Sequence, residues 1–206
     1  TTVYGTDIYG KKSLHILLKE LCKIKGIRWI RVLYCYPEEI YDELIQTMKE
    51  EKKICHYLDL PIQHASDRIL KRMGRRTTQA ELVEIVNKLR REIPDIVLRT
   101  TLISGFPGET QEDHEELMGF VDEMEFDRLG VFTYSPEEDT PAATMPDQVA
   151  EEVKEARRDE IMELQQEIAF EKSESMVGRV LDVMIEGKVA DEAAYVGRTY
   201  MDAPNV

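Results

Sequence analysis

Two short polar runs that follow apolar, β-rich segments are the first candidates for chemistry. Gln63 and His64 come directly after the apolar segment 56–62, and the run SGFPGET at 104–110 follows a second such segment. The glycines of SGFPGET let the backbone approach a ligand closely, and a helix that starts after them would offer free amide groups to a carboxylate or phosphate. An ordinary strand-to-helix turn uses the same residue types, so both interpretations stay open.

The spacing of the cysteines, histidines and serines gives little support for a metal site or for a catalytic nucleophile. The three cysteines, Cys22, Cys35 and Cys55, form no CxxC pair, and no two of the four histidines stand at ligand spacing on one helix face. We therefore expect reduced structural thiols and no metal ligands in this chain. No serine stands in a nucleophile-elbow pattern, so a hydrolytic triad is not predicted.

A cluster of four cations interrupts an otherwise acidic chain at 71–76, with the sequence KRMGRR. It could meet an anionic group of a ligand. A solvated helix end is the alternative, because runs of surface charge are commonly of that kind.

Strands and helices alternate along the first 150 residues. We predict strands at 27–35, 56–62, 96–103 and 129–134, and helices at 13–25, 37–53, 66–73, 79–92 and 110–124. Helices of this length between strands indicate a parallel sheet with the helices outside. The strands are near-continuously apolar, which is typical of parallel strands buried on both faces. No glycine-rich fingerprint follows the first strand, so a partial parallel (βα) barrel is favoured over a dinucleotide-binding fold.

The remainder of the chain consists of a proline-rich connector at 135–148, a long charged helix and two short strands. We interpret the helix as a packing strut against the barrel. The two strands predict the start of a small all-β module.

Composition limits the possible partners. The 206 residues are 42% hydrophobic, which suffices for a sizeable core, and carry a net charge of −14. Such an acidic chain repels a phosphate backbone, which disfavours nucleic acid as a partner and favours a basic protein. The sequence contains no long apolar run and no signal peptide, which predicts a cytoplasmic location without a membrane. The polar start TTVYGTDIYG, which has no initiator Met, suggests a piece of a longer protein.

Three long motifs resemble the radical-SAM methylthiotransferases of the MiaB/RimO family. They are LDLPIQHASDRILKRMGRR (58–76), LRTTLISGFPGETQED (98–113) and FDRLGVFTYSPEEDTPAA (126–143). The resemblance runs in one order over the whole chain. It implies the C-terminal part of a radical-SAM barrel at 1–148, a connecting helix at 149–174, and the truncated start of a TRAM domain, a small β-barrel, at 175–206.

Within the family the chain is more similar to the RimO branch than to the MiaB branch. The runs QHAS at 63–66, RTT at 99–101 and VGRTY at 196–200 carry this similarity. RimO-like enzymes act on a basic small-subunit ribosomal protein, whereas MiaB-like enzymes act on tRNA, and the acidic net charge agrees with the former.

The resemblance implies a reaction and its cofactors. Such enzymes attach a methylthio group to the β-carbon of an aspartate by a radical mechanism that uses S-adenosylmethionine and two iron–sulfur clusters. The cluster motif of radical-SAM enzymes, CxxxCxxC, is absent from these 206 residues. We therefore expect this piece alone to bind no cluster and to be inactive.

The resemblance also implies a set of cofactor-binding residues. Ile103 and Gly105 fall where the backbone of a barrel strand lies behind the adenine of the cofactor, and Glu109 follows shortly after them. Gln63 and His64 lie at the end of the preceding strand. Replacement of Gly105 by Val should therefore block cofactor binding. The full set of predicted cofactor-binding residues is Gln63, His64, Arg99, Thr101, Ile103, Gly105 and Glu109. No catalytic residue is assigned.

Two other functions stay open. The chain could belong to a tRNA methylthiotransferase of the MiaB type, or to a docking module without catalytic activity. An open edge of the parallel barrel would also allow self-association with a second copy.

Overall fold

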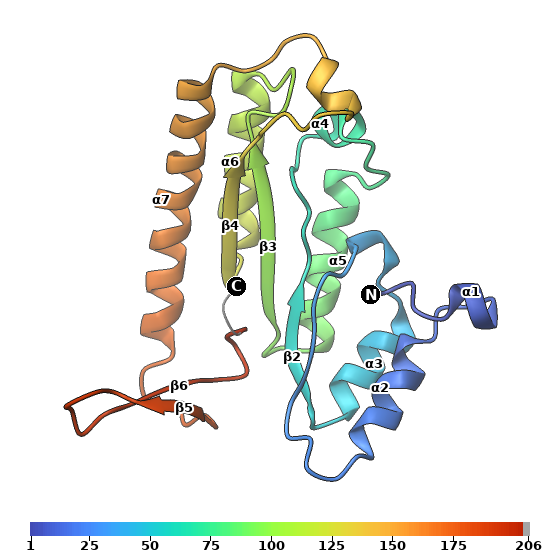
Figure 1. The fold of residues 1–206 in the computed structure, drawn as a ribbon, viewed down its shortest axis with the longest axis vertical. Helices are drawn as coiled ribbons and strands as arrows, with labels where there is room; N and C mark the ends of the chain where they lie inside the picture. Colours follow the sequence, from blue (N-terminus) through green and yellow to red (C-terminus); the bar gives the residue numbers. More distant parts are fainter. Residues whose placement is uncertain (204–206) are drawn as a thin grey trace.

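A parallel sheet forms the centre of the molecule (Figure 1), which is described for residues 1–203 by a computed structural model. Its strands are β1 (Ile30–Val32), β2 (Ile54–Asp59), β3 (Val97–Ser104) and β4 (Arg128–Thr133), and they lie side by side in that order. All three neighbouring pairs are parallel. The predicted α/β fold with parallel strands is confirmed.

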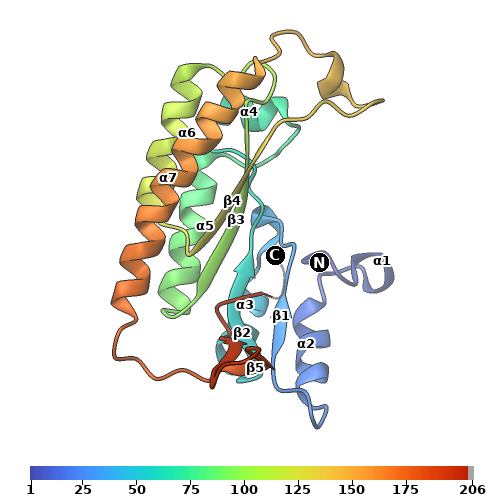
Figure 2. The ribbon, with the colours of Figure 1, turned by 60° about the vertical axis from the view of Figure 1, so that its left-hand side comes forward.

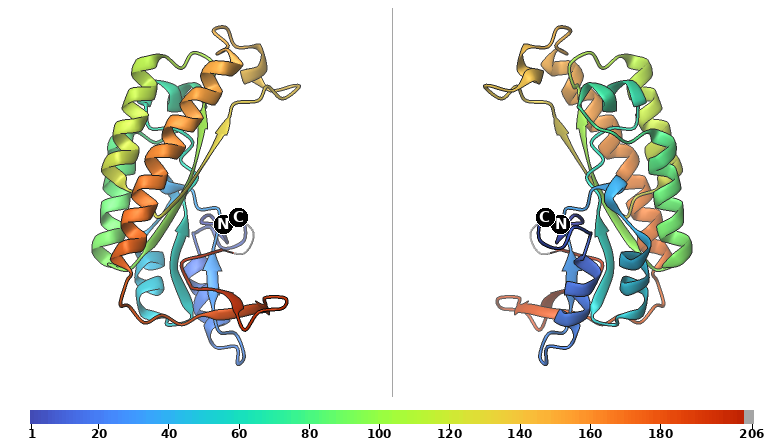
Figure 3. Two further views of the ribbon diagram at one scale, coloured as in Figure 1. Left: turned by 90° about the vertical axis from the view of Figure 1, so that its left-hand side faces the viewer. Right: turned by 90° about the vertical axis from the view of Figure 1, so that its right-hand side faces the viewer.

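Helices precede, connect and follow the strands of the sheet. They are α1 (Thr6–Tyr9), α2 (Leu14–Cys22), α3 (Asp42–Glu50), α4 (Asp67–Arg72), α5 (Gln79–Glu92), α6 (Gln111–Met124) and α7 (Glu151–Ser175), with short 3-10 turns η1 (Pro37–Glu39) and η2 (Pro141–Thr144). Figures 2 and 3 show α5, α6 and α7 standing along one face of the sheet. Each buries an apolar stripe there, and in α5 this stripe is formed by Leu82, Val86 and Leu89.

The two faces of the sheet differ, and β3 shows this most clearly. Leu98 and Leu102 are completely buried in the core beneath the helices, whereas Arg99 and Thr101, which alternate with them, are only half-buried. The prediction of near-continuously apolar strands buried on both faces is therefore wrong for β3. Its second face is polar and partly open, so functional groups can reach solvent from it.

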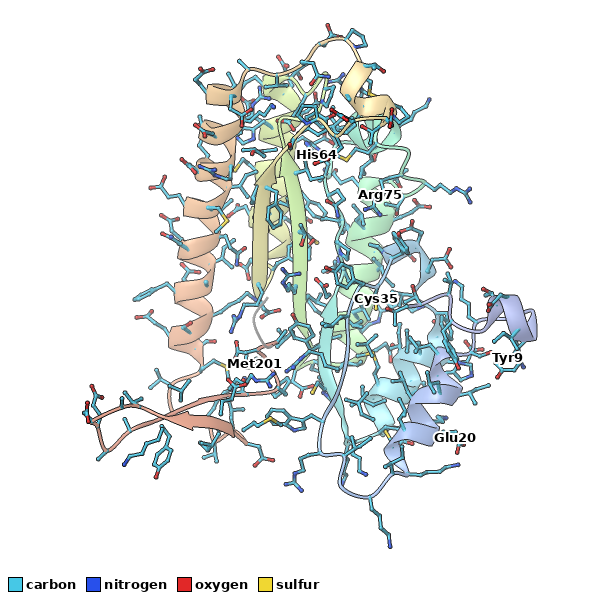
Figure 4. All side chains as sticks on the ribbon, viewed as in Figure 1. Tyr9, Glu20, Cys35, His64, Arg75 and Met201 are labelled. Atoms are coloured by element: carbon cyan, nitrogen blue, oxygen red, sulfur yellow. The ribbon has the colours of Figure 1, made fainter. Side chains whose placement is uncertain are left out.

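The chain ends in an antiparallel hairpin of β5 (Met184–Lys188) and β6 (Tyr195–Arg198). After the hairpin the backbone returns to the open face, where Arg31 donates a hydrogen bond to the carbonyl of Tyr200 at 2.7 Å. Met201 packs there against Tyr57 and its apolar neighbours, at the opposite end of the sheet from His64 (Figure 4). The domain division at 148 and 174 stays a prediction, and residues 204–206 of the last predicted domain lie outside the described residues.

Two local predictions needed correction. The first strand is much shorter than 27–35. The helix expected from Pro37 starts at Asp42 instead, because Pro37 begins a separate 3-10 turn that ends in extended backbone at Ile40. By contrast, the helix predicted at 110–124 is confirmed, and reciprocal bonds between Thr110 and Asp113 cap its start.

Within residues 1–203, no helix has the length and apolar character that a bilayer crossing requires.

The packing of α5 leads to a prediction about stability. Leu89 is fully buried, so Leu89→Ala should lower the free energy of unfolding by about 2–5 kcal/mol through lost burial and a new cavity. Asn87→Ala, at an exposed position of the same helix, should change it by no more than about 0.5 kcal/mol. Urea denaturation measures both. Equal effects of the two substitutions would show that α5 does not bury this stripe.

Candidate functional site

The seven predicted site residues gather at the carboxyl ends of β2 and β3, where ligands bind in parallel barrels. They divide between the two sides of the sheet. Thr101 and Ile103 are half-buried on the open side, and Gln63 pairs with this part of β3 through its backbone, donating to Thr101 O and accepting from Ile103 N. His64 and Glu109 are buried, at 0% and 6% exposure, and Glu109 contacts α7.

The Glu109 carboxylate is the centre of the buried group. Its Oε1 accepts a hydrogen bond from Arg157 Nη1 at 2.8 Å, and its Oε2 accepts one from the backbone N–H of Gly105 at 2.9 Å. Burial by itself would raise the pKa of Glu109. His64, Arg157 and the Gly105 N–H together outweigh this effect and lower the pKa below its ordinary value. Glu109 is therefore a stable anion that holds its own loop.

His64 is oriented by two contacts of its ring. Its Nδ1 accepts a hydrogen bond from the backbone N–H of Ser66 at 3.0 Å, which places the proton of a neutral ring on Nε2. Nε2 lies 3.3 Å from Glu109 Oε2, although the alignment is too poor for a regular hydrogen bond. The side chain thus faces the buried carboxylate and is enclosed by protein.

The open side combines charge and apolar surface. Arg99 Nη1 donates to Asp59 Oδ1 at 2.7 Å and lies 3.5 Å from Thr101 Oγ1. Ile103, the next residue of β3 on this face after Thr101, packs against an apolar cluster that includes Phe106 and Tyr134. Such a surface suits a ligand with an apolar ring at one end and an anionic group at the other.

The long helix contributes residues that the sequence did not indicate. Lys154 and Arg157 of α7 are buried at the strand ends, at 5% and 7% exposure, and Lys154 Nζ donates to the carbonyl of Tyr134 at 2.9 Å. The interpretation of α7 as only a packing strut therefore misses two contacts with the site. Buried cations in a highly charged helix leave no periodic signal in the sequence, because their partners lie 20 and 48 residues away.

The basic cluster at 71–76 supports the same loop. Arg72 Nε donates to the carbonyl of Pro107 at 2.9 Å, and Arg75 lies over the ring of Tyr36. Arg75 Nη2 also donates to the carbonyl of Pro61 at 3.4 Å. The four cations do not gather around one site for an anion. They are not all solvated either, since Arg72 binds the backbone of the SGFPGET run.

Asp113 fixes the start of α6 beneath this loop. Its carboxylate pairs with Arg68 and accepts hydrogen bonds from Ser66 Oγ at 2.7 Å and from both the N–H and the hydroxyl of Thr110. Burial opposes ionisation, but the Arg68 guanidinium and the three donors hold the pKa of Asp113 far below its usual range.

The cysteines do not form a metal centre in the described part of the chain. Among residues 1–203, no three His, Cys, Asp or Glu side chains gather as a possible ligand set. Cys35 and Cys55 are buried free thiols. Burial raises the pKa of both, that of Cys35 to about 12, which disfavours the thiolate form that binds metals.

Gly105 has a structural role that limits one test of the site. Its φ is +71°, and an added Cβ would overlap the Lys154 side chain. A Gly105→Val variant would therefore displace α7 as well as the loop, and a loss of cofactor binding would not identify Gly105 as a cofactor contact.

A cavity lies away from these residues. It has a volume of about 500 Å³, is lined by Trp29, His56 and Tyr200 among others, and is placed at the amino ends of the strands. Its position at the far end of the sheet separates it from the predicted site.

The chain matches known proteins in sequence. The model of the radical SAM superfamily matches residues 2–121. A ribosomal protein uS12 methylthiotransferase RimO from Lachnoclostridium phytofermentans is 68% identical over all 206 residues, which cover 47% of that relative. A protein of the same name from Clostridium perfringens is 58% identical, with 46% of it covered. The chain thus spans about half the length of the curated relatives that it matches.

A solved structure shares the fold. It is a radical S-adenosylmethionine methyltransferase, TsrM, from Kitasatospora setae, which carries cobalamin and a [4Fe-4S] cluster. The two chains superpose with a TM-score of 0.53 at 18% identity, over 68% of this chain and 28% of the other.

The environment of Asp113 predicts how stability depends on pH. Because the folded state lowers its pKa, the carboxylate stabilises the fold above its unfolded pKa of about 3.9, and this stabilisation is lost as the pH falls below that value. Asp113→Asn should therefore cost about 2 kcal/mol at pH 7 and clearly less at pH 3. Urea midpoints at both pH values measure this difference, with Glu116→Gln at an exposed position of α6 as the control. A cost that is the same at pH 3 would contradict the assignment.

Proposed function

The chain belongs to the radical SAM superfamily, and we propose that it is part of an enzyme that attaches a methylthio group to the β-carbon of an aspartate in a small-subunit ribosomal protein. The observation that carries this proposal is the identity of 68% over the full chain with a uS12 methylthiotransferase. The aligned region spans all 206 residues and so includes the strand-end runs that contain the predicted site.

We propose that S-adenosylmethionine binds at the carboxyl ends of β2 and β3. Ile103 and its apolar neighbours would accept the adenine, while Gln63, Arg99 and Thr101 would hold the polar amino-acid end. The cofactor would supply a radical that removes hydrogen from an unactivated carbon, which no side-chain base can deprotonate. His64, Gly105 and Glu109 would contribute from behind the strand by fixing the loop.

The residues of this chain do not fit an iron–sulfur cluster. Cys35 and Cys55 are buried and their thiols resist ionisation. We propose that the cluster ligands lie in the sequence outside these 206 residues, since the curated relatives are about twice as long.

The proposed partner is a basic ribosomal protein. The net charge of −14 favours such a partner electrostatically and disfavours nucleic acid. We place the reaction in the cytoplasm, where ribosomes assemble. Association of two copies through the edge strand β1 or β4 remains a prediction that light scattering can examine.

The substrate is tested with the intact protein after anaerobic reconstitution of its clusters. We expect methylthiolation of an aspartate in uS12, detected by peptide mass spectrometry, and no change in tRNA treated in parallel. Modification of tRNA alone would favour a MiaB-type enzyme. An intact protein that modifies neither substrate and does not cleave S-adenosylmethionine would favour a docking module without catalytic activity.

The contact of Thr101 with the cofactor is tested by binding. Thr101→Val keeps the shape but removes the hydroxyl from the open face of β3, so it should weaken S-adenosylmethionine binding about 3- to 10-fold, the value of one hydrogen bond. Calorimetry on the intact protein measures the change. Thr133→Val, the same substitution at the last residue of β4, is the control. Equal affinities of the two variants would remove Thr101 from the site.

A further inference from the structure

The first turns of α7 connect to the carboxyl ends of two strands. Lys154 Nζ donates to the carbonyl of Tyr134, which follows β4, at 2.9 Å. The carbonyl of Lys154 in turn accepts a hydrogen bond from the hydroxyl of Ser104, the last residue of β3, at 2.9 Å. One residue of α7 thus ties together the ends of β3 and β4.

Arg157, one turn further along α7, binds the loop after β3. Its Nη1 donates both to Glu109 Oε1 at 2.8 Å and to the carbonyl of Glu109 at 3.2 Å. The guanidinium is almost fully enclosed, and its Nε is buried without a partner in the described residues. The helix therefore places a buried positive charge directly against the buried carboxylate.

Stability alone gives little reason for this pair. Moving two charges out of water is costly, and apolar residues of similar volume usually stabilise a buried position equally well or better. Two other buried side chains of α7, Ile161 and Ile168, show this alternative, since they pack on the core without charge. A buried ion pair at the strand ends is consistent with a need to fix one particular loop conformation.

The loop conformation in question is that of Gly105. Glu109 Oε2 accepts the N–H of Gly105 at 2.9 Å, and Gly105 takes a φ of +71° at the exit of β3. We propose that Arg157 is a positioning residue, which holds Glu109 so that Gly105 and Ile103 present the surface on which S-adenosylmethionine lies. This inference rests on the proposed function. It extends that function to a helix about 50 residues away from the loop in sequence.

The test compares neighbouring arginines of α7 in the intact protein. At metal sites, removing a group that does not touch the metal but holds one of its ligands lowers the affinity by about 10- to 100-fold. We expect Arg157→Gln to lower S-adenosylmethionine affinity about tenfold in calorimetry. Arg158→Gln, which replaces a more exposed arginine paired with Asp159, should leave the affinity unchanged.

Conservative replacement separates positioning from general packing. Because both contacts to Glu109 come from the single atom Nη1, the ammonium of Arg157→Lys can replace them, and this variant should retain most of the affinity. Adding Glu109→Gln to Arg157→Gln should cause little further loss, because Arg157 acts through Glu109. Equal affinity of Arg157→Gln and Arg158→Gln would overturn the inference, as would failure of Arg157→Lys to restore binding.

Two further measurements keep the outcome decisive. If Arg157→Gln fails to fold, the double variant R157M/E109M removes both buried charges and should fold. Binding by that variant at wild-type affinity would also overturn the inference. Amide exchange at Gly105 should accelerate in Arg157→Gln and remain unchanged in Arg158→Gln. If the wild-type protein does not bind S-adenosylmethionine, the proposed function fails, and exchange at Gly105 still decides whether Arg157 positions the loop.

Discussion

The buried carboxylate of Glu109 sets the conformation on which the rest of the site depends. An ionised carboxylate can remain in a protein interior only where donors and positive charge replace water. Here the N–H of Gly105 and the guanidinium of Arg157 on α7 donate hydrogen bonds to the carboxylate, and Nε2 of His64, which follows β2, lies 3.3 Å from it. Meeting this requirement fixes the end of β2, the end of β3 and the first turns of α7 relative to one another.

This requirement explains why the site has two sides. The alternation of β3 sends Thr101 and Ile103 to the open face, where a ligand can contact them. The ionic network around Glu109 lies behind the strand and contacts α7. The residues proposed to contact the ligand and the residues that support the loop are therefore separated by one strand, so the open face keeps side chains that the supporting network does not use.

The sequence predicts those parts of the structure that depend on local patterns. The bounds of α5, Gln79–Glu92, follow from an amphipathic stripe and the capping box at Thr78 and Glu81, both of which act within one helix. The strand-end runs were also located correctly. The side on which each residue lies could not be predicted, because it depends on the register of β3 and on cations of α7 far along the chain. The short length of β1 could not be predicted either, because it depends on where β1 pairs with β2 and the apolar residues of one segment do not determine that pairing.

Charge serves two separate purposes in this chain. The fully buried charges nearly cancel, with the carboxylates of Asp59, Glu109 and Asp113 set against Lys154 and Arg157. Almost the whole surplus behind the net charge of −14 is therefore carried by residues that reach solvent. Dissolved salt weakens the long-range interactions of exposed charges, whereas it weakens the interactions of buried ion pairs far less. The attraction of the proposed basic partner and the shape of the proposed cofactor surface can therefore vary independently, because different residues determine them.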